Sequence, residues 1–238
     1  MPPARIAFWA ATVAGIAFTV RSVLTEPPSL TVSAACACAY FALLIAGILW
    51  LRLGMFADAL IHGPSGATGV ALTFEGALEP TRTRELLDAL DAHEEAKATF
   101  FVAGVNAEEH RALVEELVSR GHDLGIVGFV RDRFMVLRGT KRVQSELERA
   151  VRAIENITEK APLFFRPPMG HTNPTMARLA DRLDLTMVGW SARAGDTTRL
   201  EDGAIVRIAD AKELATTLDK LASKNLRVTK LSAWLDDA

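Results

Sequence analysis

Cysteine is nearly absent from this chain, and the little there is lies in one place. Only Cys36 and Cys38 occur among the 238 residues, both in an apolar segment near the amino terminus. With one residue between them, their side chains point apart on a helix, so the pair does not suit an intrachain disulfide. We interpret both as small apolar packing residues. The chain from residue 57 onward has no cysteine, so its sequence does not indicate a redox compartment.

An excess of charge of either sign is absent as well. The chain has 27 basic and 29 acidic residues and a formal net charge of −2. Such a balance argues against a nucleic-acid partner, because those interfaces need clustered positive charge. The charges are unevenly distributed: the first 52 residues hold very few, and the rest of the chain is rich in Glu, Asp, Arg and Lys. The mean hydropathy of +0.18 reflects that first segment.

Two long apolar runs fill the charge-poor segment. The first begins at Ile6 and continues past Arg21 to residue 24, and the second covers Thr31–Leu51. Each approaches the roughly 20 residues with which a helix crosses a bilayer. The sequence therefore predicts a transmembrane hairpin over residues 1–56, with helices at about 6–24 and 31–51. This predicts a multi-pass protein of the cell membrane that contacts membrane lipid. A cleaved signal peptide is the alternative for the first run.

The side of the membrane on which the rest of the chain lies is only weakly encoded. A hairpin places both of its ends on one side, together with Arg5 and Arg52, and leaves Arg21 on the other side. Basic residues are enriched on the cytoplasmic side of membrane spans, and here the excess is about one charge. That excess favours a cytoplasmic domain, and the side is left open.

The remaining chain alternates short apolar strands with amphipathic helices. A linker at 57–67 separates this domain, 68–238, from the hairpin. Strands are predicted at 70–74, 98–102, 163–165, 185–190, 204–208 and 226–231, and residues 121–125 introduce a further short strand. Helices are predicted at 82–93, 107–119, 141–158, 174–183 and 211–223. Repeated βα units predict a parallel sheet covered by helices. Their number favours an α/β fold of the distorted, partly closed (β/α) barrel type, with functional side chains on the loops after the strands.

A motif at the end of the first predicted strand is the most informative in the chain. Residues Thr73–Leu78 read T-F-E-G-A-L. Later motifs read R-G-H-D-L-G at 120–125, F-R-P-P-M-G at 165–170 and V-G-W-S at 188–191. In this order, over roughly residues 68–232, they resemble the polysaccharide deacetylases (NodB-homology domain, carbohydrate esterase family 4), whose first motif reads T-F-D-D-G-P. Several ordered matches carry more weight than any one motif.

The resemblance implies a metal site whose ligands are missing from this sequence. Active members hold a divalent metal with one Asp and two His, and the metal-bound water attacks an acetamide carbonyl. By the resemblance, the Asp corresponds to Gly76 and the two His correspond to Val127 and Arg131. Glycine and valine offer no ligand atom, and arginine adds a permanent positive charge. The acid His corresponds to Ala209. We therefore expect no metal and no other cofactor.

An acid and several arginines remain at the same end of the predicted strands. By the resemblance, Glu75 occupies the general-base position, and Arg166 corresponds to the arginine that pairs with that base. We expect a Glu75–Arg166 ion pair with a further link to Asp196. Arg131 and Arg193 add positive charge to the rim. A salt-bridged network that closes the barrel mouth is the favoured interpretation, and catalysis by Glu75, Arg166 and Asp196 is the alternative.

Four further residues are candidates for binding a glycan beside that network. Pro167 and Met169 belong to the third motif, His171 follows it, and Trp190 lies near a strand end where its ring could stack on a sugar. Simple surface exposure of His171 and core packing of Trp190 are the alternatives. His122, which precedes a short strand, is interpreted as a structural residue.

Together, these features predict a membrane-anchored, deacetylase-like protein of cell-envelope carbohydrate metabolism. As a pseudoenzyme it would bind an N-acetylated glycan or glycolipid without hydrolysing it. One alternative is an active hydrolase that cleaves the carbon–nitrogen bond of N-acetyl sugars without metal, with Glu75 as base. In that case Arg131, Arg166 or Arg193 would stabilise the oxyanion. The other alternative is a membrane scaffold whose domain offers a docking face.

Overall fold

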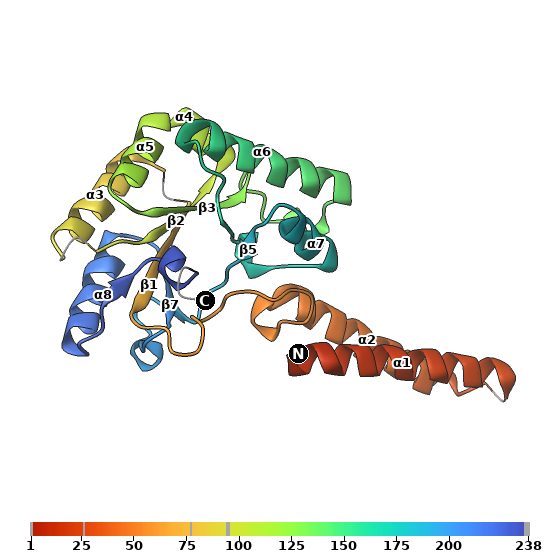
Figure 1. Ribbon diagram of the computed structural model, residues 1–238. Helices are drawn as coiled ribbons and strands as arrows, with labels where there is room; N and C mark the ends of the chain where they lie inside the picture. The colour runs from red at the N-terminus through yellow and green to blue at the C-terminus, as the bar shows by residue number, and fades with distance from the viewer. Residues whose placement is uncertain (1, 26, 77, 94–95, 236–238) are drawn as a thin grey trace.

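Two antiparallel helices project from a curled barrel in the computed structural model (Figure 1). The structure describes residues 2–25, 27–76, 78–93 and 96–235. Helix α1 spans Pro3–Leu24 and α2 spans Leu30–Leu49, close to their predicted bounds. Both are long and apolar enough to cross a membrane, and almost nothing of either is buried in the molecule. Glu26, in the predicted turn between them, lies outside the described residues.

The base of this hairpin is joined to the barrel by direct contacts. Arg5 forms a bidentate pair with Asp58, with nitrogen–oxygen distances of 2.8 and 3.1 Å. The Thr172 amide donates to the Ile48 carbonyl at 3.0 Å. A 3-10 turn at Leu51–Leu53 follows α2, and its first residue is buried in the main core. The hairpin and the barrel therefore share an interface.

A parallel sheet of eight strands forms the wall of the barrel. The strand order is β5-β4-β3-β2-β1-β7-β6, and β8 pairs with β1. The strands are β1 Val70–Glu75, β2 Thr99–Ala103, β3 Asp123–Gly128, β4 Phe164–Phe165, β5 Thr186–Met187, β6 Ala192–Arg193, β7 Ile205–Ile208 and β8 Val228–Thr229. All pairings between these strands are parallel. This confirms the predicted α/β fold with a distorted, partly closed barrel.

Helices cover the outside of the sheet (Figure 1). They are α3 Pro80–Asp91, α4 Gly104–Glu109, α5 Arg111–Ser119, α6 Thr140–Thr158, α7 Pro174–Arg182 and α8 Ala211–Ser223. In α6, buried Val143, Leu147 and Ile154 follow the helical period that predicted it. The single helix predicted at 107–119 is divided at His110, whose φ of −118° and ψ of 44° are not helical.

The segment predicted as a linker, 57–67, is packed onto the barrel. Leu60 pairs with Val188 next to β5, and His62 pairs with Ala204 next to β7. The path of hydrogen-bonded strands ends at β5 on one side and at β6, the neighbour of β7, on the other. The segment therefore crosses the side on which the sheet is open.

Apolar side chains fill the barrel interior. They are Ala71, Phe101, Ala103, Val127, Phe164, Val188, Ile205, Leu231 and Trp234, all buried. A larger cluster lies between the sheet and its helices. Because the interior is packed, the space left for binding or chemistry lies at the strand ends and in the loops that follow them.

His122 is a buried structural histidine, as the sequence suggested, and its proton binding is coupled to folding. Its Nδ1 accepts the Ala98 amide at 3.2 Å, and its Nε2 is buried without a hydrogen-bond partner. Burial lowers the pKa of His122 to about 4, and the charge of Lys97 contributes to this. The unfolded chain binds this proton near pH 6.5. Stability should therefore fall as the pH drops from about 6.5 to about 4, because only the unfolded state is protonated there.

We expect His122→Asn to flatten this dependence. The asparagine oxygen can still accept the Ala98 amide, but the side chain cannot ionise. Between pH 7 and pH 4.5 the wild-type chain should lose about 2 to 3 kcal/mol more than the variant. Thermal unfolding of the full chain in detergent measures this, with His110→Asn as the control. Equal slopes for wild type and His122→Asn would contradict the assignment.

Candidate functional site

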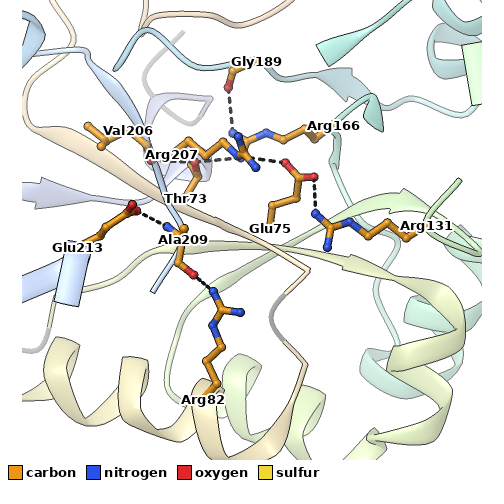
Figure 2. A network of polar contacts seen from close by, with 10 residues as sticks. All are labelled: Thr73, Glu75, Arg82, Arg131, Arg166, Gly189, Val206, Arg207, Ala209 and Glu213. Atoms are coloured by element: carbon orange, nitrogen blue, oxygen red, sulfur yellow. Dashed lines mark hydrogen bonds and ion pairs between the residues drawn. The ribbon is translucent and has the colours of Figure 1, made fainter. Parts of the chain in front are cut away.

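Glu75, the last residue of β1, lies at the centre of a group of arginines (Figure 2). Its side chain is 7% exposed. One carboxylate oxygen lies 3.4 Å from Nη2 of Arg131, and the other lies 3.4 Å from Nε of Arg207. Both oxygens of the Glu75 carboxylate therefore face a guanidinium group.

Arg166 follows β4, and its guanidinium is completely buried. It donates from Nη1 to the Thr73 hydroxyl at 3.0 Å and from Nη2 to the Gly189 carbonyl at 2.9 Å. Thr73 in turn donates to the Val206 carbonyl at 2.8 Å. The guanidinium also stacks over the ring of Phe101, 4.0 Å from its centroid. Arg166 thus ties together several strands of the barrel wall.

The predicted Glu75–Arg166 ion pair is therefore wrong. Arg207 takes that place because the parallel register of β1 and β7 sets Arg207 opposite Thr73, two residues before Glu75. Arg166 interacts with Glu75 only through its charge. Burial lowers the pKa of Arg166 to about 9, the negative charge of Glu75 raises it, and Arg207 lowers it further.

The guanidinium of Arg131 fills the space beside Gly76. Gly76 has a φ of +74°, a conformation that side chains rarely adopt. A β-carbon built on Gly76 would lie 2.7 Å from Nη1 of Arg131. Gly76 and Arg131, both at expected ligand positions, are therefore complementary in space: the arginine occupies room that exists because residue 76 has no side chain.

The residues at the expected ligand positions do not fit a divalent metal ion. Val127 is buried among the apolar side chains of the barrel interior, and Arg131 presents a cation. In the described parts of the chain, no group of three or more His, Cys, Asp or Glu residues is arranged to hold a metal. Carboxylate, imidazole and thiolate are the side chains that bind such ions, and this donor set lacks them.

Ala209, at the expected position of the acid histidine, contributes only its backbone. Its carbonyl accepts from Arg82, and its amide donates to Glu213 at 2.7 Å (Figure 2). A methyl side chain cannot transfer a proton. The backbone around Ala209 is nevertheless held firmly, through α3 and α8.

A second group of predicted residues lines a pocket of about 620 Å³. The predicted residues in its wall are Met169, His171, Trp190, Arg193 and Asp196. Pro167 does not line it; it is buried and precedes the 3-10 turn Pro168–Gly170. The predicted link from Asp196 to Glu75 and Arg166 is also wrong, because Asp196 lies 3.6 Å from Arg199 instead.

Trp190 lies between this pocket and the arginines around Glu75. The Cζ atoms of Arg207, Arg166 and Arg193 lie 5.2, 5.7 and 5.9 Å from the centroid of its ring. Two of these arginines belong to the Glu75 group and the third lines the pocket. Arginine over an indole face is a favourable cation–π arrangement. The half-buried ring of Trp190 therefore separates the pocket from the group of arginines around Glu75 and contacts both.

Sequence reasoning missed three arginines of the site. Arg207 could have been suspected, because it is a charged residue inside the apolar strand predicted at 204–208. The sequence marks Arg52 only as a basic residue at the end of a predicted span, yet it donates to the Ser191 carbonyl at 2.8 Å. Arg199 donates to the same oxygen at 3.3 Å, and no local pattern marks it.

The fold and sequence are similar to those of known deacetylases. The chain is 26% identical over 198 residues to a peptidoglycan-N-acetylglucosamine deacetylase of Bacillus cereus, covering 72% of this chain and 90% of that protein. It is 30% identical over 173 residues to the peptidoglycan-N-acetylglucosamine deacetylase PgdA of Listeria monocytogenes, covering 65% of this chain but only 36% of that protein.

A solved structure of a carbohydrate esterase family 4 pseudoenzyme from Bacillus anthracis has the same fold. Its TM-score is 0.67 at 21% identity, with 77% of this chain and 71% of that chain covered. A mutant of it, described as having restored enzymatic activity, has the same TM-score. The sequence profile of the polysaccharide deacetylases matches residues 62–188, more than half of the chain. This chain therefore belongs to the polysaccharide deacetylase family.

Proposed function

We propose that this protein is a membrane-anchored pseudoenzyme that binds an N-acetylated glycan of the cell envelope without hydrolysing it. The observation that carries the proposal is the placement of Arg131. Its guanidinium fills the space beside Gly76 and faces Glu75, the residue in the position of the general base. The same side chain therefore excludes a metal ligand and occupies an oxygen of the base.

The charges of the site support this proposal. Arg131 and Arg207 face Glu75 directly, and buried Arg166 lies behind it. A divalent cation placed beside Glu75 would meet three fixed positive charges and one carboxylate. Repulsion between like charges is strong in a partly buried site, where water screens it poorly. The site therefore opposes a metal through its electrostatics as well as through its missing ligands.

The pocket beside Trp190 supports a retained capacity to bind sugar. Binding sites for small ligands are concave, largely apolar and supplied with a few polar groups. Trp190 offers an aromatic face on which a sugar ring could stack, and His171 and Asp196 supply polar groups in the same wall. N-acetylglucosamine units are the substrate named for the bacterial relatives, and an N-acetylated glycan is therefore the ligand we propose.

The exposed surface of the helix pair supports membrane anchoring. Large apolar side chains stand exposed along α1, among them Ile6, Trp9, Val13, Ile16 and Val20, each more than half exposed. A soluble surface rarely carries an apolar patch of this extent. A lipid bilayer would cover it, which is consistent with two spans of 22 and 20 residues.

Acetate release from N-acetylated chitooligosaccharides tests the loss of hydrolysis. The full chain in detergent should release no acetate above background, with or without added zinc, cobalt or chelator. The same preparation should bind the oligosaccharide. Acetate release that a chelator abolishes would overturn the proposal. If the preparation did not bind the oligosaccharide, the result would instead favour a membrane scaffold, the alternative function that requires no glycan.

Metal-free hydrolysis with Glu75 as base is the second candidate, because guanidinium groups near a carboxylate could stabilise an oxyanion. Glu75→Gln distinguishes the two. In our account this change leaves glycan binding intact and lowers stability by about 1 to 3 kcal/mol, because three arginines lose their counter-charge. Glu85→Gln, the same change at an exposed glutamate of α3 that lies outside the pocket, is the control. Chelator-resistant acetate release that disappears in Glu75→Gln would establish the second candidate.

A further inference from the structure

The pocket beside Trp190 is built jointly by the barrel and by the end of the second long helix. Its walls include Leu49–Arg52 from the hairpin base and Gly189–Arg193, which runs from the loop after β5 through β6. Helix α2 ends at Leu49, and Trp50 is 59% exposed. Tryptophan is enriched where a membrane span meets the head-group region. If the hairpin spans a bilayer, the Leu49–Arg52 wall of the pocket lies at the level of the lipid head groups, because α2 ends there.

Positive charge is concentrated in this pocket. Arg52 and Arg199 converge on one oxygen, the Ser191 carbonyl, at 2.8 and 3.3 Å. Arg193 also lines the wall, and in the described part of the chain its side chain makes no hydrogen bond or ion pair. The acidic residue in the wall is Asp196, which already pairs with Arg199. Three arginines therefore face one carboxylate.

The positive charges of Arg52 and Arg199 repel each other. Burial lowers the pKa of Arg52, the nearby charge of Arg199 lowers it further, and Asp196 raises it. An anion between these guanidinium groups would relieve their repulsion. The planar, forked guanidinium suits a phosphate well, because two of its N–H groups can bind two phosphate oxygens at once. A phosphate group therefore matches both the charge and the geometry of the pocket.

Apolar surface beside the arginines indicates what carries the phosphate. Leu49, Leu51 and Ile61 line the same pocket, and Leu49 belongs to the apolar surface of α2. An acyl or other hydrocarbon chain attached to the phosphate could continue along that helix. A small soluble phosphate ester would use the arginines but would leave this apolar surface uncovered.

We propose that this pocket binds the phosphate of an anionic membrane lipid, with Arg52, Arg193 and Arg199 as its ligands. The inference rests on the proposed membrane anchoring, and it is independent of whether the Glu75 group hydrolyses anything. A group esterified to the far side of the phosphate would lie against Trp190, in the direction of Glu75. The pocket would thereby hold a lipid-linked ligand by its phosphate, the part of the ligand nearest the membrane.

Direct binding to the purified full chain in detergent tests this assignment. The probes are dioctanoyl phosphatidic acid, dioctanoyl phosphatidylcholine and glycerol 3-phosphate, titrated by calorimetry. We expect phosphatidic acid to bind at least ~10-fold more tightly than either other probe, because it alone combines an exposed anionic phosphate with acyl chains. Arg193→Gln should weaken its binding about 10-fold, and Arg193→Glu should abolish it.

Arg84→Gln is the matched control, because Arg84 is an exposed arginine on α3, on the far side of the barrel from the hairpin (Figure 1). It should bind phosphatidic acid like the wild type. Arg193 is exposed, and among the described residues its side chain forms no hydrogen bond or ion pair, only the cation–π contact with Trp190. Its variants should therefore melt within about 4 °C of the wild type. Equal affinity for phosphatidic acid and phosphatidylcholine, or an Arg193→Gln variant that binds like Arg84→Gln, would overturn the proposal.

Two further outcomes test the lipid assignment and the membrane anchoring separately. Glycerol 3-phosphate that binds as tightly as phosphatidic acid would show a soluble phosphate ester as the ligand and overturn the lipid assignment. Membrane anchoring is measured separately, by resistance of the full chain to extraction from membranes with alkaline carbonate. An extractable chain would contradict the anchoring even if the arginines still bound phosphate.

Discussion

The triple variant Gly76→Asp, Val127→His, Arg131→His is expected to bind zinc at least ~100-fold more tightly than the wild-type chain. It supplies one carboxylate and two imidazoles at the expected ligand positions, and it removes the guanidinium that lies beside Gly76. Losing even an outer partner of a metal ligand typically costs 10- to 100-fold in affinity, so gaining three ligands should have at least that effect. Equilibrium dialysis with zinc measures it.

Single changes should fail for a reason that the structure specifies. In Gly76→Asp alone, the new β-carbon would lie 2.7 Å from Nη1 of Arg131, and the φ of +74° disfavours a side chain. That variant should be less stable than wild type and should bind no zinc. Arg131→His alone removes one partner of Glu75 and supplies one ligand, which is not enough for tight binding. Tight zinc binding by either single variant would contradict this account of the site.

The triple variant must also be shown to fold. Val127 is packed in the barrel interior, so a histidine there buries a polar ring that needs a partner, which the metal would provide. We therefore expect zinc to raise its thermal midpoint, as binding to the folded state alone requires. A folded triple variant with neither zinc binding nor a zinc-dependent midpoint would show that the three positions do not converge.

Arg166→Ala should destabilise the protein more than any other single arginine change. The substitution leaves a cavity over Phe101 and removes the donor to Thr73 and Gly189, all inside the barrel. Breaking a buried charged contact on one side costs about 3 to 5 kcal/mol. For a chain of this size that corresponds to a fall of roughly 6 to 20 °C in the thermal midpoint.

Two companion variants separate the contributions. Arg166→Met keeps most of the side-chain volume, so it should recover a large part of the loss, since apolar replacement of a buried charge is often tolerated. Arg207→Gln removes a guanidinium that is one-third exposed and should cost about 1 kcal/mol. If Arg166→Ala melted within about 2 °C of wild type, its buried contacts would not be holding the barrel together.

The fold could be predicted from the sequence because its signals are local. Buried strands such as Thr99–Ala103 are short apolar runs, and α6 shows a clear helical period. The closure of the barrel by segment 57–67 could not be predicted in the same way. Its two bridges, from Leu60 and His62, depend on partners more than 120 residues away and leave no periodic pattern.

Part of the candidate site could be predicted as individual residues, but the pairs that they form could not. Glu75 ends β1, and Arg131 and Arg166 follow β3 and β4; parallel strands bring such residues to one edge of the sheet. Which arginine reaches Glu75 depends on register: Arg207 lies on the strand next to β1, whereas Arg166 follows β4, three strands away. The family pattern suggested Arg166, but the side chain is directed to Thr73 and Gly189.

The relation between Gly76 and Arg131 is a further feature that only the three-dimensional structure reveals. From the sequence, each is a separate loss of a ligand. In the structure, the arginine lies in the space that the missing side chain leaves, and it pairs with Glu75. An aspartate at position 76 would displace the exposed guanidinium of Arg131, which could then pair with the new carboxylate. This proximity, together with the lack of a ligand atom at Val127, is why we expect no single substitution to create a tight metal site.

The metal content of the wild-type chain tests the central claim most directly. The full chain would be incubated with excess zinc or cobalt, dialysed and measured by elemental analysis, with the triple variant as the positive control. The account predicts about one equivalent in the triple variant and no stoichiometric metal in the wild type. One equivalent of zinc in the wild type, lost when Glu75 is changed to Gln, would contradict it, because an ion would then be bound where Arg131 is placed.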